Sequence, residues 1–228
     1  TENQGLTKNL VQGMNMARAE FVARMDADDI CMPHRLATQV AHMIEHPEVS
    51  VLGSAVTFFD ESGKEFVAHQ PLEHEEIKCA LFYGFTMLHP SVMIRRADFE
   101  KHGLNYDPAF RVSQDHDLWT RAIRKVRFAN IHEPLLGMRE HEGKIGRTSK
   151  PHQQELSDLV RKRQLYELGI EATEQEIGVF NVELATKSKW CLNDLKIYEA
   201  LLLKIIEANR RALVFNQNIL EQMGAAVF

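Results

Sequence analysis

Cysteine, long apolar runs and an excess of positive charge are all scarce in this chain of 228 residues. Its cysteines, Cys31, Cys79 and Cys191, lack any Cys-x-x-Cys spacing, which argues against a disulfide framework or a zinc site. No stretch approaches the roughly 18 uninterrupted apolar residues of a membrane span. The net charge of −5 and the pI near 6.1 argue against a nucleic-acid partner. We therefore expect a location in the reducing cytoplasm.

The chain has the composition of a folded globular protein, with 44% hydrophobic and 26% charged residues. Residues 1–150 mix short apolar β-type runs with short helical patterns and many turn residues. Residues 151–228 have almost purely helical patterns. We predict an α/β domain over residues 1–150 and an all-helical C-terminal extension over residues 151–228.

Local patterns predict individual elements in both regions. The expected strands cover residues 20–25, 49–59, 64–69, 91–94, 126–131 and 135–138. The expected helices of the first region cover residues 6–17, 33–46, 73–82, 97–102 and 117–125. The second region should contain helices over 153–168, from 174 onward, and one long helix over 193–223. For these C-terminal helices we expect a role in packing or partner contact.

The first motif that can carry chemistry is Asp26-Ala27-Asp28-Asp29, at the end of an apolar strand. Ligands of α/β folds gather at the carboxyl ends of strands, and residues i and i+2 of an extended chain point to the same side. Asp26 and Asp28 can thus present two carboxylates to Mg²⁺ or Mn²⁺, which prefer oxygen ligands. An Asx turn, or a cap for the helix after Pro33, is the alternative interpretation.

Asp115, in the segment Ser113–Arg121, lies at the start of a helix whose apolar face contains Leu118 and Trp119. A helix N-terminus stabilises a carboxylate, so Asp115 can remain ionised and act as a base. The alternative is a simple helix cap.

A third segment, Gly137–Gly143, follows an extended run. Arg139 can face a phosphate and His141 can ligate a metal, while a solvent-facing or structurally paired histidine is the alternative. In the segment Leu88–Arg96, His-Pro indicates a loop that enters a strand, with two arginines after it.

The order of these motifs resembles the family 2 glycosyltransferases of the GT-A fold. An Asp-x-Asp-Asp strand end is followed by Ser-Val-Met-Ile-Arg-Arg, then Gln-Asp-His-Asp-Leu-Trp-Thr-Arg, then Leu-Gly-Met-Arg-Glu-His. Gly5–Asn9 and Ala17–Met25 also resemble that family's approach to its metal motif. The resemblance extends over residues 5–147. It implies a GT-A-like α/β fold, with a mixed sheet and flanking helices.

The same resemblance implies an inverting transfer of a sugar from a nucleotide-diphosphate donor. By resemblance, Asp28 is the principal ligand of a divalent cation, Mg²⁺ or Mn²⁺, and Asp26 is its partner near the ribose or the metal. Asp115 matches the position of the general base, and His141 is a further metal or phosphate contact. The expected acceptor is a saccharide or lipid-linked hydroxyl in surface polysaccharide or glycoconjugate synthesis. We also expect the protein to make peripheral contact with the inner face of the membrane.

Two departures from the family pattern matter. Gln114 stands where family members usually carry a glutamate before the base. The opening strand and the nucleotide-binding βα segment are also absent, so we expect the first strands of the sheet to be missing and the chain to be a piece of a longer enzyme. An uncovered strand edge would favour pairing with another chain, so we expect a homodimer.

Three other functions stay open on the sequence. A non-catalytic binding or assembly module, or a degenerate remnant, would be consistent with the missing nucleotide-binding half and the large helical C-terminal extension. A phosphatase of the haloacid dehalogenase type also uses a strand-end Asp-x-Asp, but Ile30 stands where threonine or valine is expected. A nucleotidyltransferase uses paired carboxylates with two metals, but the chain has no glycine-rich phosphate loop.

Overall fold

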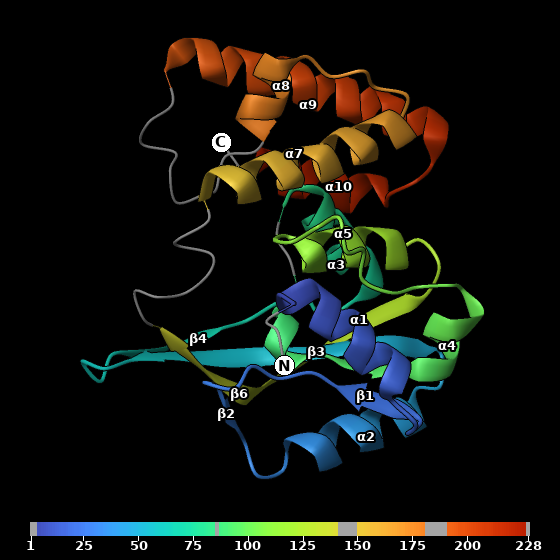
Figure 1. The fold of residues 1–228 in the computed structure, drawn as a ribbon. Helices are drawn as coiled ribbons and strands as arrows, with labels where there is room; N and C mark the ends of the chain where they lie inside the picture. The colour runs from blue at the N-terminus through green and yellow to red at the C-terminus, as the bar shows by residue number, and fades with distance from the viewer. Residues whose placement is uncertain (1–3, 85–86, 141–149, 181–190, 227–228) are drawn as a thin grey trace.

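A mixed β-sheet forms the centre of the structure, a computed structural model that describes residues 4–84, 87–140, 150–180 and 191–226 (Figure 1). Its order is β1-β5-β3-β6-β2, and β4 pairs with β3. The pairing of β3 with β6 is parallel, and the other pairings are antiparallel. The strands are β1 (Phe21–Ala23), β2 (Ile30–Cys31), β3 (Val49–Asp60), β4 (Glu65–Ala68), β5 (Met93–Arg95) and β6 (Arg127–Glu140).

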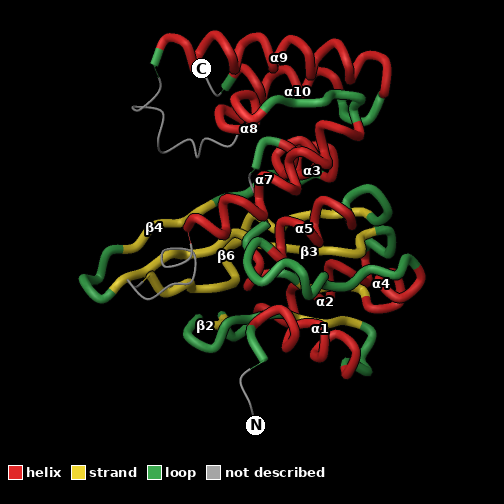
Figure 2. The backbone as a smooth tube through the Cα atoms, turned by 45° about the horizontal axis from the view of Figure 1, so that its top comes forward, coloured by secondary structure: helices red, strands yellow, loops and turns green. Residues whose placement is uncertain are grey.

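Helices cover both faces of this sheet, and a further helical layer lies over one of them. Figures 1 and 2 show α3 between the sheet and the helices α8, α9 and α10. No helix in the described part of the chain is long and apolar enough to cross a membrane. The helices are α1 (Leu6–Met16), α2 (Arg35–Glu45), α3 (His74–Phe82), the short 3₁₀ helix η1 (His89–Ser91), α4 (Arg96–Lys101), α5 (Gln114–Ala122), α7 (Lys150–Glu167), α8 (Glu174–Phe180), α9 (Leu192–Ala212) and α10 (Gln217–Ala225).

The alternation of side chains along β3 divides the apolar core between the two faces of the sheet. Val51 packs in a cluster with Leu118 and Trp119 of α5, whereas its neighbour Leu52 packs with Met43 of α2 on the other face. Successive residues of a strand point to opposite faces, so one buried strand supplies both cores. The mixed α/β sheet with flanking helices is therefore as predicted.

Helix α3 joins the sheet to the helical layer. Leu81 lies in the cluster with Trp119, while Phe82 lies in a separate cluster with Leu165 of α7, Leu201 of α9 and other C-terminal residues. Both Leu81 and Phe82 are fully buried. Helix α7 begins at residue 150, which agrees with the expected change from mixed to helical patterns at that point. The division into two domains stays a prediction.

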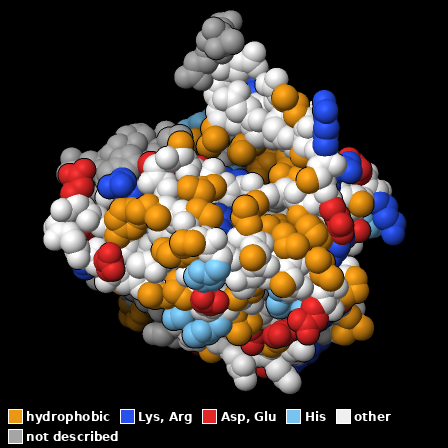
Figure 3. Space-filling view, turned by 90° about the horizontal axis from the view of Figure 1, so that it is seen from below, with side chains coloured by type: hydrophobic (Ala, Val, Ile, Leu, Met, Phe, Trp, Pro, Cys, Tyr) orange, Lys and Arg blue, Asp and Glu red, His pale blue; other side chains and the backbone are white. Residues whose placement is uncertain are grey.

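Helix α2 has a polar inner face. Arg35 and Gln39 are buried, whereas Leu36 and Ile44 are 52% and 67% exposed. Figure 3 views the molecule from below in Figure 1, the side on which α2 lies, and shows hydrophobic side chains spread over that surface. The buried Arg35 and Gln39 therefore present polar groups that can form hydrogen bonds with neighbouring backbone.

Several boundaries of the first region differ from the sequence-based prediction, and two of these differences bear on the site. Residues 126–131 and 135–138, expected as separate strands, belong to the single strand β6, whose pairing with β3 shifts register near Pro134. A bulge accommodates the proline, which cannot donate to the ladder. Helix α5 begins at Gln114, three residues before the predicted start at Asp117, so Asp115 lies in its first turn.

The prediction of a single long helix over residues 193–223 is wrong. Leu213 has a left-handed backbone conformation, with φ of 52°, and separates α9 from α10. The Asn209 side chain donates to the Phe215 carbonyl at 3.0 Å and accepts from the Phe215 N–H at 2.8 Å. Asn216 then caps α10 by accepting from the Ile219 N–H. These contacts turn the chain without a glycine or proline.

Candidate active site

Asp26 follows β1 and is held by an arginine two residues earlier. Arg24 Nη1 donates to Asp26 Oδ2 at 3.0 Å, and a second hydrogen bond joins Arg24 Nη2 to Asp26 Oδ1. Residues i and i+2 of extended backbone lie on the same side, which brings these two groups together. The Asp26 side chain keeps 40% of its surface exposed. It is therefore oriented by Arg24 and still open to a ligand.

The polar face of α2 fixes the backbone at this strand end. Arg35 Nη2 donates to the Arg24 carbonyl at 2.7 Å, and Arg35 Nε donates to Gln39 Oε1 at 3.0 Å. Gln39 Nε2 in turn donates to the Ser91 carbonyl at 2.8 Å. Because each buried polar group has a partner, the polar inner face of α2 stabilises the strand end that carries Asp26.

The rest of the acidic loop contacts the strand that carries Arg139. Asp28 is exposed, whereas Asp29 is only 8% exposed. Asp29 Oδ1 accepts a hydrogen bond from the Arg139 backbone N–H at 3.3 Å, and Ile30 pairs with Gly137 between β2 and β6. The structure thus brings together two segments that the sequence analysis singled out separately.

Neither acidic motif caps a helix through a side chain. The residue before α2 is His34, and the residue before α5 is Ser113; neither makes a side-chain cap hydrogen bond. Asp115 Oδ1 accepts from the adjacent His116 N–H at 2.9 Å. The N-cap residues are thus His34 and Ser113 and not these acids, although the Asp115 carboxylate accepts from an N–H of the first turn of α5.

Asp115 lies in the same polar site as Arg24 and Asp26. Desolvation by burial raises the pKa of the Asp115 carboxyl, and the negative charge of Asp26 raises it further. The His116 N–H and the positive charge of Arg24 act in the opposite direction and lower that pKa. A carboxylate that is short of water and close to another carboxylate holds a proton more tightly, which suits a base.

A buried histidine–tyrosine pair completes this site. His89 Nε2 lies 2.7 Å from the Tyr106 hydroxyl, and burial lowers the pKa of His89 well below its usual value. Burial raises the pKa of Tyr106, on which the charges of Arg24, Asp115 and Asp26 also act. Both side chains are therefore uncharged at neutral pH.

The predicted site residues differ in how closely the structure brings them together. Asp26 and Asp115 share one site, and Asp28 lies in the loop that follows Asp26. The Arg139 guanidinium stacks over the Phe59 ring at 5.0 Å, and its backbone contacts the acidic loop. His141 lies outside the described residues.

The sequence analysis missed Arg24, His89 and Tyr106 as members of the site. The i, i+2 spacing of Arg24 and Asp26 is a signal that could have identified the arginine. Tyr106 is linked to these residues by its hydrogen bond with His89 and by the charges that act on it, and no local sequence pattern indicates either.

A divalent cation held by the described residues of this site would need further ligands. Within the described ranges, no three histidine, cysteine, aspartate or glutamate side chains form a group that could hold a metal. Mg²⁺ and Mn²⁺ commonly use one or two carboxylates, with water and substrate phosphates as the other ligands. An exposed Asp28 beside a half-exposed Asp26 fits a cation that is shared with a bound diphosphate.

Comparison with known proteins gives consistent matches. Residues 1–103 match the sequence model of Glycosyl transferase family 2. The chain is 30% identical over 187 residues to the amylovoran biosynthesis glycosyltransferase AmsE of Erwinia amylovora, covering 82% of this chain and 62% of the relative. It is 35% identical over 139 residues to an uncharacterized glycosyltransferase of Methanocaldococcus jannaschii, covering 60% of this chain and 47% of the relative. The chain thus spans about half to two thirds of these relatives.

A solved structure has the same fold. The crystal structure of residues 1–349 of S. aureus TarS superposes with a TM-score of 0.56 at 15% identity, covering 100% of this chain and 68% of that one. The similarity confirms the GT-A-like fold. Residues 1–103 belong to glycosyltransferase family 2, as their match to the family model and the curated relatives named as glycosyltransferases show.

Proposed function

We propose that this chain contributes the catalytic base and metal loop of an inverting glycosyltransferase that uses a nucleotide-diphosphate sugar. The observation that carries the proposal is that Arg24, which binds Asp26 through its guanidinium, and Asp26 itself both act electrostatically on the Asp115 carboxyl. A base and an acidic metal loop are the two groups that such a transfer requires. TarS, which has the same fold, has been crystallised with UDP-GlcNAc, which supports this class of donor.

In the proposed reaction, Asp115 removes the proton from an acceptor hydroxyl. The hydroxyl oxygen forms a bond to the anomeric carbon as the bond from that carbon to the diphosphate breaks. Attack occurs from the face opposite the leaving group, so the configuration inverts. Because desolvation raises the pKa of Asp115, its carboxylate is a stronger base than an exposed aspartate.

Asp28 and Asp26 would hold a divalent cation, with His141 as a further ligand or phosphate contact. When bound, the cation neutralises charge on the departing diphosphate. Arg139, whose backbone adjoins the acidic loop, is placed to approach the same diphosphate. The assignment of Arg139 rests on the contact of its backbone with Asp29, and that of His141 rests on the family resemblance alone.

The acceptor that we propose is a saccharide or lipid-linked hydroxyl used in polysaccharide synthesis. AmsE is named for amylovoran biosynthesis, and another relative, 29% identical over 124 residues, is named as an O-antigen biosynthesis glycosyltransferase of Escherichia coli. These names support the class of pathway.

Calorimetric titration tests the proposal. UDP and GDP should each be titrated into the chain with and without Mn²⁺, and the experiment repeated with Asp28→Ala. We expect nucleotide binding that needs Mn²⁺ and is lost in Asp28→Ala, but is retained in Glu61→Ala, which removes an exposed acid from the β3–β4 turn. Binding that is equal with and without the metal would overturn the metal assignment. No binding to either nucleotide would favour a non-catalytic module or a piece of a longer enzyme.

A further inference from the structure

Helix α7 contacts the segment that carries Asp115 on both sides of that residue. On one side, Ser113 Oγ lies 2.9 Å from Ser157 Oγ and donates to the Gln153 carbonyl at 3.3 Å. Ser113 has a left-handed backbone with φ of 56°, a conformation that non-glycine residues rarely adopt. The contacts with α7 therefore support an unfavourable turn just before α5.

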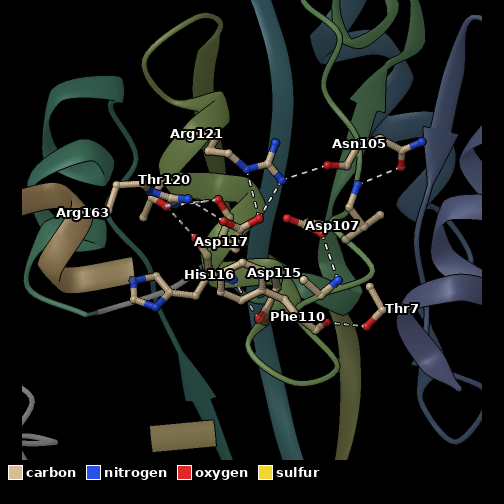
Figure 4. A network of polar contacts seen from close by, with 12 residues as sticks. Thr7, Asn105, Asp107, Phe110, Asp115, His116, Asp117, Thr120, Arg121 and Arg163 are labelled. Atoms are coloured by element: carbon tan, nitrogen blue, oxygen red, sulfur yellow. Dashed lines mark hydrogen bonds and ion pairs between the residues drawn. The ribbon is translucent and has the colours of Figure 1, made fainter. Parts of the chain in front are cut away.

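On the other side, Arg163 of α7 binds Asp117. Asp117 is 1% exposed, and its Oδ1 lies 2.8 Å from Arg163 Nη1. Its Oδ2 accepts from Arg121 Nη2 at 2.7 Å, while Arg163 Nη2 also donates to Thr120 Oγ1 at 2.9 Å (Figure 4). A buried carboxylate with two guanidinium partners makes this end of α5 sensitive to either one.

The turn is also tied to other elements. Arg121 Nη2 donates to the Asn105 carbonyl at 2.9 Å, and Thr7 Oγ1 of α1 donates to the Phe110 carbonyl at 2.7 Å (Figure 4). The loop before α5 is thus held by α1 and α5, whereas the residues that flank Asp115 contact α7. Val160 and Leu165 are fully buried, and Leu165 lies in the core of the helical layer, so α7 has apolar anchorage apart from its polar contacts with α5.

We propose that α7 is a positioning element for the base, acting through Ser157 on Ser113 and through Arg163 on Asp117. Asp115 is two residues from each contact, so both flanks of its backbone are fixed by a helix of the C-terminal region. The helical region then contributes to catalysis indirectly, by positioning the base, in addition to its packing role. This inference rests on the proposed role of Asp115 as the base.

The test compares Arg163→Gln, Arg163→Lys and Ser157→Ala with the unaltered chain. Arg163→Gln should lower kcat roughly ten- to hundredfold while leaving the donor KM within about twofold, because a displaced base slows chemistry more than binding. Arg163→Lys should recover part of the lost kcat, since it restores the charge without the two-pronged geometry. Ser157→Ala, which leaves no buried charge unpaired, should lower kcat less.

The matched control is Lys162→Gln, at the neighbouring residue of α7, whose ammonium pairs with Glu174 at 2.6 Å and not with α5. It should leave kcat and its pH dependence unchanged. Folded Arg163→Gln or Ser157→Ala with unchanged kcat and unchanged pH profile would overturn the positioning role. Equal losses in the Lys162→Gln control would also overturn it.

Backbone hydrogen exchange separates failure of this inference from failure of the proposed function. Even if the chain transfers no sugar, Arg163→Gln or Ser157→Ala should speed exchange at residues 113–117 relative to Lys162→Gln. Unchanged exchange there in folded variants would refute the positioning role, whatever the activity. Faster exchange in a chain without transfer activity would support the α7 contacts, while the proposed function would fail.

Discussion

The guanidinium charge of Arg24 lowers the pKa of the Asp115 carboxyl, which burial raises. The same guanidinium holds the Asp26 carboxylate through two hydrogen bonds. One arginine at the end of β1 therefore connects the acidic loop to the start of α5. The charge of Arg24 thus couples Asp26 to Asp115.

Asp115→Asn should remove turnover and leave donor binding nearly intact. The amide keeps the size and the acceptor oxygen of the carboxylate but cannot take a proton. We expect a fall in kcat of about 10²–10⁴-fold, the range for a lost general base. Steady-state kinetics together with calorimetric donor binding would check this. Transfer at the unaltered rate would disprove the base assignment.

The same variant should be more stable than the unaltered chain at neutral pH. Folding raises the pKa of Asp115 above its ordinary value of 3.8, so the folded state prefers the protonated form. The stabilising contribution of this group is thus present at low pH and lost as the pH rises through the raised pKa. The substituted amide has no charge to desolvate, so the variant's advantage in Tm should shrink as the pH falls.

Thermal melts of Asp115→Asn across the acid range would measure that trend, with Glu61→Gln, an exposed acid, as the control. The control should show no comparable gain at neutral pH. A lower Tm for Asp115→Asn than for the unaltered chain at neutral pH would contradict the desolvation of Asp115.

Arg24→Gln should move the acid limb of the pH–activity profile to higher pH. The positive charge of Arg24 lowers the pKa of Asp115, so its removal lets the base take up a proton at a higher pH. Arg18→Gln removes an exposed charge beyond the end of α1 and should leave the profile in place. An acid limb that moves equally in both variants would mean that net charge, and not Arg24, sets the pKa.

Gly53→Ala should destabilise the sheet. A Cβ at residue 53 would lie 2.1 Å from Asn130 Oδ1 and 2.7 Å from Met87 Cε, so neighbours must move. We expect a loss of about 1–3 kcal/mol in the free energy of unfolding. Gly13→Ala in α1, where a Cβ meets nothing within 4 Å, should instead gain about 0.5–1 kcal/mol. Urea titration measures both, and equal midpoints would refute the close packing.

Local pattern was sufficient for much of the fold and for the acidic loop. A run of β-branched and aromatic residues identified β3, and strand-end chemistry identified Asp26 and Asp28, because both depend on neighbours in the sequence. The break at Leu213 was not predictable in this way, since leucine disfavours a left-handed backbone and the turn depends on Asn209 and its contacts with Phe215.

The residues of the site that sequence patterns did not identify were missed for one common reason. His89, Tyr106 and the Arg163–Asp117 pair act through contacts between residues far apart in the sequence. No spacing rule identifies such pairs in a single sequence. Arg24 is the exception, because it stands two residues before Asp26, which the sequence patterns had already singled out.

Anomalous diffraction from crystals of the chain grown with Mn²⁺ and UDP or GDP tests the central claim most directly. The account predicts a manganese peak within about 2.0–2.2 Å of an Asp28 carboxylate oxygen, shared with the diphosphate and in the same cleft as Asp115. Manganese bound at other side chains, or an Asp115 carboxylate that faces away from the bound diphosphate, would contradict it.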